Sequence, residues 1–187
     1  YFPFADGLKL WDALAELGVT PVGIETYANS RRLEKSLRLQ NADLETDYNL
    51  YEAGLARPKV KAANFHGKDA YVAQRELPEQ VAYLCTFALE DTTDSDGVVR
   101  YPVGQWPLLD KETKEVIVDN HGRRSYTTSV AFGPSLGQNI AMGYLPADRA
   151  KEGDTVYMEY FGNFFSARVT AVGYRAMLDP DNVRVKT

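Results

Sequence analysis

The sequence predicts an α+β protein in which helices and loops come first and an antiparallel β-barrel or sandwich follows. Apolar residues near the start of the chain repeat every three positions, which is typical of an amphipathic helix. After Pro78 the side chains alternate with a period of two, which is typical of β-strands. We therefore expect a boundary near residue 78, with one unit over residues 1–78 and a second over residues 79–187.

Three helices are expected before this boundary. The first covers residues 6–18, with Asp6 accepting hydrogen bonds from the free amides at its start and Gly18 allowing the left-handed turn that ends it. Its apolar stripe consists of Leu8, Trp11, Leu14 and Leu17. Shorter helices are expected over residues 22–30 and 69–75.

Strands are expected after the boundary. Residues 81–89 alternate with both faces largely apolar, which indicates a strand buried on both sides. Further alternating runs lie near residues 125–132 and 140–145. A hairpin is predicted over residues 156–172, with Gly162-Asn163 as its two-residue turn.

Composition limits the class of protein. The 187 residues carry a net charge of −5 and a pI near 5.1, which argues against a protein that neutralises nucleic-acid phosphates. A single cysteine, Cys85, excludes a disulfide framework within the chain. No apolar run approaches the roughly 18–20 residues that a membrane span needs. The first residues resemble neither an initiator nor a secretory signal, so we expect a piece of a longer cytoplasmic protein with no nucleic-acid or membrane partner.

One carboxylate, Glu34, has two possible roles. It lies among the charges of Arg32-Leu33-Glu34-Lys35, which favours a surface ion-pair cluster. Alternatively, its two in-plane oxygens could accept adjacent N–H donors from a flat heterocycle inside a cavity. Spacing alone does not select between these roles. His66 and His121 have no partner at metal-ligand spacing, so no metal site is expected. Cys85 alternates with core positions of a predicted strand, which favours a buried, inert thiol.

Four segments, in this order, resemble those of the aminomethyltransferase family, whose type member is the glycine-cleavage T-protein. They are residues 28–36 (L-R-x-E-[KA]), 50–55 (P-x-E-A-G-L), 65–70 (F-x-G-[RK]-x-A) and 133–146 (S-P-S-L-x-x-x-I-A-x-x-Y-[VL]-P). Within that family, Lys35 after Glu34, the hairpin residues 159–162 and the pair Asp179-Pro180 look closest to the folate domains of dimethylglycine oxidases and dehydrogenases and of sarcosine dehydrogenases.

The resemblance implies a three-domain ring around a central hole that holds tetrahydrofolate. Residues 1–78 would be the end of a mixed α/β folate-binding domain, and residues 79–187 the antiparallel, jelly-roll-like C-terminal β-barrel. Glu34 matches the family glutamate that holds the pterin edge. Tyr27 and Arg32 flank it and are expected to line the same cavity. The family's catalytic aspartate lies in a region that has no match here, so no catalytic residue is assigned.

The function implied is one-carbon transfer to tetrahydrofolate. A methyl donor such as dimethylglycine or sarcosine would be oxidised by FAD in a missing upstream domain, and the one-carbon unit captured as 5,10-methylenetetrahydrofolate. Two alternatives remain: demethylation of an O- or S-methyl donor without flavin, and a non-catalytic folate-binding module. The expected partner is the missing N-terminal region or a separate subunit, without which the fragment would be inactive. In a eukaryote the compartment would be the mitochondrial matrix.

Overall fold

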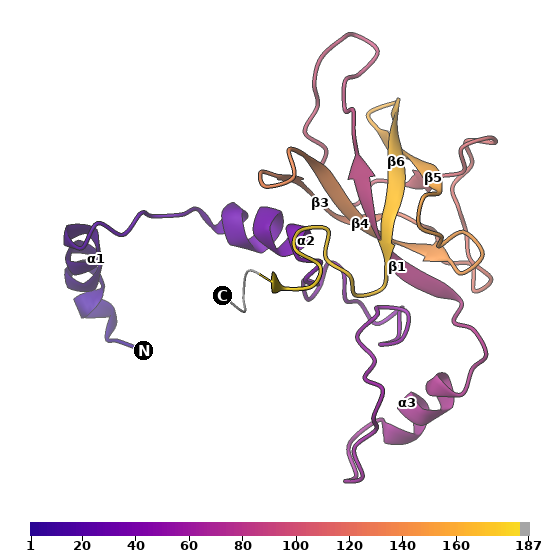
Figure 1. Ribbon diagram of the computed structural model, residues 1–187, viewed down its shortest axis with the longest axis horizontal. Coiled ribbons are helices and arrows are strands. Elements are labelled where there is room, and N and C mark those ends of the chain that lie inside the picture. Colours follow the sequence, from indigo (N-terminus) through magenta and orange to yellow (C-terminus); the bar gives the residue numbers. More distant parts are fainter. Residues whose placement is uncertain (184–187) are drawn as a thin grey trace.

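The computed structural model describes residues 1–183, and their strands form one antiparallel sheet that curls into a half-barrel (Figure 1). The strand order across the sheet is β2-β5-β6-β1-β4-β3. The strands are β1 (Ala82–Leu89), β2 (Leu108–Leu109), β3 (Thr127–Gly133), β4 (Gln138–Pro146), β5 (Thr155–Tyr160) and β6 (Asn163–Val172). The expected α+β class with an antiparallel β-barrel is confirmed.

Strand β1 lies in the middle of the sheet and is covered on both faces. It pairs antiparallel with β4 on one edge and with β6 on the other. Phe87 packs with Met158 and other apolar residues in the larger core cluster, whereas Leu84 packs on the opposite face with Leu33. Residues 81–89 are apolar at successive positions because both faces of the strand are buried, as the sequence predicted.

The hairpin β5–β6 forms as expected, but its turn lies one residue earlier than predicted. Tyr160 pairs with Asn163, so the turn residues are Phe161 and Gly162, with φ angles of 50° and 78°. Two positive φ angles match the twist of the flanking strands. The Glu159 carboxylate also accepts the Gly162 N–H at 2.6 Å, which stabilises this register. The predicted turn Gly162-Asn163 is therefore wrong by one position.

Strand β2 was not predicted, because two residues give no measurable period. Leu108 and Leu109 pair with β5, and the adjacent Pro107 forms a bridge with Tyr126, just before β3. The Leu108 N–H donates to the Ser125 carbonyl at 3.0 Å. Backbone hydrogen bonds thus link β2, at one edge of the curled sheet, to the residues just before β3, at the other edge.

The first and last predicted helices appear as α1 (Gly7–Glu16) and α3 (Lys68–Arg75). Gly18 has a φ of 75° just beyond α1, as expected for a residue that ends a helix. The predicted cap is wrong: Asp6 lies in a short 3-10 turn, η1 (Phe4–Asp6), and its carboxylate accepts from Lys9 Nζ at 3.1 Å instead. The turn adds residues ahead of α1, so Asp6 does not occupy an extended cap conformation.

The second helix covers residues 24–34 rather than the predicted 22–30. It consists of a π-helical stretch, η2 (Thr26–Arg31), followed by α2 (Arg32–Glu34). The helix continues through its charged end because Arg32 pairs with Asp43 and Glu34 accepts the backbone N–H of Ser135, both outside the helix. Local sequence patterns do not register such long-range contacts.

Helix α1 stands away from the sheet (Figure 1), and none of its residues is buried. The side chains of its apolar stripe are exposed, with Trp11 at 57% and Leu8 at 71%. None of the helices in the described part of the chain has the length and hydropathy that crossing a bilayer requires.

Residues 32–55 pack against the outer face of the sheet. Leu33 and Ala53 join Leu84 and Ile140 in a second core cluster. The Leu84 N–H donates to the Glu52 carbonyl at 2.8 Å, which joins this segment to β1 directly. The division of the chain at residue 78 stays a prediction.

Arg123 fastens the loop before Ala53 to the barrel. Its guanidinium binds Glu52 and Asp119, each at 2.6 Å, and lies over the Tyr48 ring at 4.2 Å. Burial acts to raise the pKa of Asp119, but hydrogen bonds from the Arg123 backbone and side chain outweigh it and lower that pKa below its usual range.

Replacing Gly54 with alanine is expected to destabilise the chain by about 2–4 kcal/mol. Gly54 has a φ of 68°, and a Cβ there would lie 2.7 Å from the Gly173 Cα and 2.8 Å from the Tyr174 nitrogen. Gly97→Ala is the matched control, because its φ is 78° but nothing lies within 4 Å of its Cβ position. It is expected to cost only about 1 kcal/mol. Equal losses in chemical denaturation would contradict the proposed close approach.

Acidification is expected to reduce the free energy of unfolding as pH falls through the lowered pKa of Asp119. The native state favours the carboxylate, so this contribution is present above the unfolded-state pKa of about 3.9 and is lost below the folded-state value. Asp119→Asn is expected to flatten the dependence of stability on pH in this acidic window. Denaturant unfolding at several pH values measures how the free energy of unfolding changes with pH in both proteins. The same change in both would show that Asp119 does not contribute to it.

Candidate functional site

Glu34, the last residue of α2, has a fully buried side chain at 0% exposure. One carboxylate oxygen, Oε1, accepts the backbone N–H of Ser135 at 2.6 Å. The other, Oε2, accepts from Arg31 Nη1 at 3.1 Å. The ion pair considered from the sequence therefore exists, but it does not lie at the surface on the Glu34 side. The carboxylate is inside the protein and its plane is fixed by two donors.

The end of β3 leaves room for this carboxylate because residue 133 is glycine. A Cβ at Gly133 would lie 2.5 Å from Ile140 Cδ1 and 3.3 Å from Glu34 Cγ and Oε1. The connection from β3 to β4 can therefore approach α2 closely enough for Ser135 to donate its N–H to Glu34. Residues 133–136 belong to a segment singled out in the sequence, and the structure brings that segment to Glu34.

Arg31 has a half-exposed side chain, at 53%. Its Nη1 atom also lies 2.6 Å from the Ser135 hydroxyl oxygen, to which it donates. A single guanidinium nitrogen thus contacts both α2 and the β3–β4 connection, beside the buried carboxylate.

Arg32 makes a different set of contacts and does not touch Glu34. Its guanidinium forms a buried ion pair with Asp43 and donates to the Ser129 hydroxyl at 2.6 Å. Asp43 is itself fully buried and accepts hydrogen bonds from the hydroxyls of Thr128 and Ser129. We call Arg32, Asp43, Thr128 and Ser129 the anchor network. Every donor named here is directed into the protein, so Arg32 holds the helix against β3.

A cavity of about 390 Å³ lies between this helix and β3. Arg32 is one of its lining residues, together with residues 128–132 of β3 and residues 101–104. Glu34 is not among them. In the described residues this cavity is lined by Arg32 and not by Glu34, and the implication of the resemblance that both line one ligand cavity stays a prediction. Residues two apart on a helix point in different directions, which is the physical reason for the separation.

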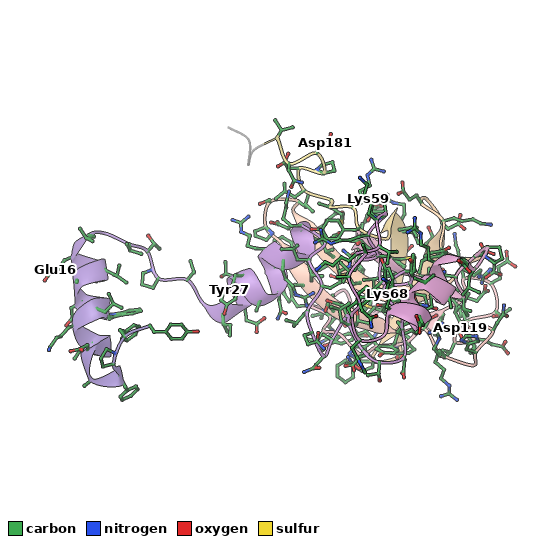
Figure 2. The ribbon with its side chains drawn as sticks, turned by 90° about the horizontal axis from the view of Figure 1, so that it is seen from below. Glu16, Tyr27, Lys59, Lys68, Asp119 and Asp181 are labelled. Carbon is green, nitrogen blue, oxygen red and sulfur yellow. The ribbon has the colours of Figure 1, made fainter. Side chains whose placement is uncertain are left out.

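Tyr27 lies in the π-helical stretch with its side chain 63% exposed. Figure 2 shows it on the helix between α1 and the sheet. The helix over residues 24–34 thus carries an exposed aromatic ring and a buried carboxylate. That both contact one ligand stays a prediction.

The segment after β6 returns to α2 and fastens it from another side (Figure 1). The Leu178 N–H donates to the Glu34 carbonyl at 2.9 Å. Lys35 Nζ donates to the carbonyls of Leu178 and Asp179, and the Ser36 hydroxyl donates to the carbonyl of Arg175 at 2.6 Å. The family resemblance singled out Lys35 and Asp179 separately, but the sequence did not predict that the two residues are in contact.

Within residues 1–183, neither Cys85 nor a cluster of metal-binding side chains provides a second reactive centre. Cys85 is buried in β1, and burial raises its pKa to about 12, so its thiol stays protonated near neutral pH. Among residues 1–183, no cluster of three His, Cys, Asp or Glu side chains could hold a metal ion. Sequence reasoning missed Asp43 and its hydroxyl partners, because nothing in an isolated aspartate indicates that it is buried.

Comparisons with known proteins agree with the fold. Residues 104–172 match the family described as the glycine cleavage T-protein C-terminal barrel domain. The crystal structure of the glycine cleavage system aminomethyltransferase T from Bartonella henselae has a TM-score of 0.64 and 24% identity, covering 95% of this chain and 46% of that one. At that identity the likeness supports the fold alone.

Curated relatives extend the match to most of the chain. The aminomethyltransferase of Desulfitobacterium hafniense (strain DSM 10664 / DCB-2) is 30% identical over 178 residues, or 90% of this chain and 43% of the relative. The aminomethyltransferase of Picosynechococcus sp. is 31% identical over 166 residues, or 87% of this chain and 40% of the relative. The chain therefore spans less than half the length of these relatives. It belongs to the aminomethyltransferase family and carries the C-terminal barrel domain of the glycine-cleavage T-protein.

Proposed function

We propose that this chain is the C-terminal part of a tetrahydrofolate-dependent one-carbon transfer enzyme, in which Glu34 holds the edge of the pterin ring. The single observation that carries the proposal is the buried carboxylate of Glu34, oriented by the Ser135 N–H. It occupies the position of the family motif to which ligand binding is attributed. We call the chain together with the part that corresponds to the remaining length of its relatives the assembled enzyme.

The residues present fit a pterin edge chemically. Each carboxylate oxygen has two acceptor directions, and Ser135 and Arg31 use one on each oxygen. Glu34 can therefore accept a ring N–H and an adjacent amino group, which are donors in one plane. Its role is to orient the ligand, since a fixed ligand is placed against the one-carbon unit and shielded from water. When bound, tetrahydrofolate supplies the nitrogen that accepts that unit.

The finer proposal concerns the methyl donor. The sequence features at Lys35, residues 159–162 and Asp179 favour an N-methyl amine such as dimethylglycine or sarcosine, oxidised by FAD in another part of the assembled enzyme to give 5,10-methylenetetrahydrofolate. The competing candidate is aminomethyl transfer without flavin, and the names of the curated relatives favour it. Turnover of dimethylglycine or sarcosine by the assembled enzyme, with bound FAD, separates the two.

We also propose that the apolar stripe of α1 packs against the rest of the assembled enzyme. The stripe carries Leu8, Trp11, Leu14 and Leu17, all exposed in this chain. Contiguous exposed apolar side chains of this kind mark an interaction surface. The relatives are more than twice as long as their match to this chain, which provides a partner of sufficient size.

Glu34→Ala in the assembled enzyme is expected to weaken tetrahydrofolate binding by about tenfold or more, because a charge-assisted pair of hydrogen bonds is lost. Amine oxidation by the flavin part should stay nearly intact. Calorimetric titration measures the affinity, and Glu34→Gln keeps the shape of the side chain while removing its charge. Glu112→Ala is the control, since Glu112 is an exposed carboxylate away from α2. Unchanged affinity in both Glu34 variants would reject the role.

Leu14→Glu is expected to leave the stability of the isolated chain unchanged, because α1 has no buried residue there. In the assembled enzyme the same change should lower the melting temperature by several degrees, since a buried leucine contributes about 1.5–3 kcal/mol. Glu16→Lys is the control on the same helix, outside the apolar stripe. Equal melting temperatures for Leu14→Glu and the unmodified assembled enzyme would show that the stripe does not pack there.

A further inference from the structure

The two oxygens of Glu34 are held by groups of very different mobility. Oε1 accepts from a backbone N–H, that of Ser135, in a connection fixed at both ends by the pairing of β3 with β4. Oε2 accepts from the side chain of Arg31, which is half exposed and can rotate into solvent. A ligand that approaches both oxygens therefore meets one donor that is fixed in place, Ser135, and one that can move away, Arg31.

No ligand can reach Glu34 unless an atom that covers it moves, because the Glu34 side chain has 0% exposure. Moving Ser135 would disturb the β3–β4 connection. Moving Arg31 requires only side-chain rotation and the loss of one long and one short hydrogen bond, at 3.1 Å to Glu34 and 2.6 Å to the Ser135 hydroxyl. Of the two donors that hold the carboxylate, Arg31 is therefore the one that can yield.

The contrast with the next residue supports this assignment. Arg32 is only 7% exposed and is bound by Asp43 and Ser129 within the anchor network. Breaking a buried pair leaves an uncompensated charge, which is strongly destabilising. Arg31 has an exposed side, and ion pairs with an exposed partner contribute little.

We propose that Arg31 is a displaceable counter-ion for Glu34. It pairs with the buried carboxylate in the ligand-free enzyme and leaves Oε2 when a flat heterocycle with two adjacent N–H donors binds. The N–H groups of the ligand lack the full positive charge of Arg31. Two hydrogen bonds to the carboxylate replace that charge better than one does, so the exchange favours a ligand with two adjacent N–H donors. The inference rests on the proposed function, because it assumes that Glu34 is the ligand-binding carboxylate.

The test compares the tetrahydrofolate affinity of the unmodified assembled enzyme with that of Arg31→Met, by calorimetry at low and high salt. Removing the Arg31 guanidinium is expected to strengthen binding by about 1.5- to fivefold, the range for an ion pair with a half-exposed partner. Added salt weakens the Arg31–Glu34 pair, so it should favour binding to the unmodified enzyme relative to Arg31→Met. The glutamate tail of tetrahydrofolate is charged, so salt affects its binding in both proteins. Because this effect is the same in both, comparing the salt dependence of the two affinities removes it.

Arg149→Met is the matched control. Arg149 has a side chain exposed to 43% and pairs with Asp110, away from α2, so its replacement should change neither the affinity nor its salt dependence. Arg31→Lys keeps the charge and should bind the ligand like the unmodified enzyme. Unfolding curves verify that each variant is folded.

Weaker or unchanged binding in Arg31→Met, with Glu34→Gln still impaired, would overturn this inference and leave the proposed function standing. That result would mean that Arg31 contacts the ligand or is irrelevant to it. Unchanged binding in Glu34→Gln would reject both the proposed function and the inference. Stronger binding in Arg31→Met, lost again in the Arg31→Met/Glu34→Gln double variant, supports both.

Discussion

The buried ion pair between Arg32 and Asp43 fixes the end of the helix over residues 24–34 against the barrel, and the arrangement around Glu34 depends on it. Two charges inside a protein are tolerated only when hydrogen bonds satisfy them, and the Thr128 and Ser129 hydroxyls do so here. The pair joins the helix over residues 24–34 to a loop and to β3 at once. The end of that helix is thereby fixed against the barrel, and the direction of every side chain in its last turn is set.

This constraint explains why neighbouring residues have such different environments. With Arg32 held toward Asp43, Glu34 is turned toward the β3–β4 connection, where Gly133 leaves space for its carboxylate. Arg31 stays partly in solvent beside it. The segment after β6 then closes over the same turn through Lys35 and Leu178. Four regions of the chain thus meet at a short piece of helix.

The elements with strong local signals were predicted well from the sequence. The apolar stripe of α1 and the alternation in β1 each follow from repeats within a few residues. Errors arose where local signals were weak. β2 is too short to show a period, and the β5–β6 turn lies at Phe161-Gly162, where the Glu159 carboxylate accepts the Gly162 N–H. The helix that ends at Glu34 is longer than its local sequence pattern predicts, because Asp43 and Ser135 bind the charged side chains of Arg32 and Glu34.

The sequence by itself determined the kinds of element, their order and the family motif around Glu34, and it left two possible roles for that carboxylate. Only the tertiary structure decided that Glu34 is buried, that Ser135 and Arg31 hold its two oxygens, and that Arg32 belongs to the anchor network. The reason is separation along the chain: the contacts from Glu34 to Ser135 and from Arg32 to Ser129 span 101 and 97 positions. No periodicity in the sequence reports contacts over such distances, whereas the curled sheet brings both pairs within hydrogen-bonding range.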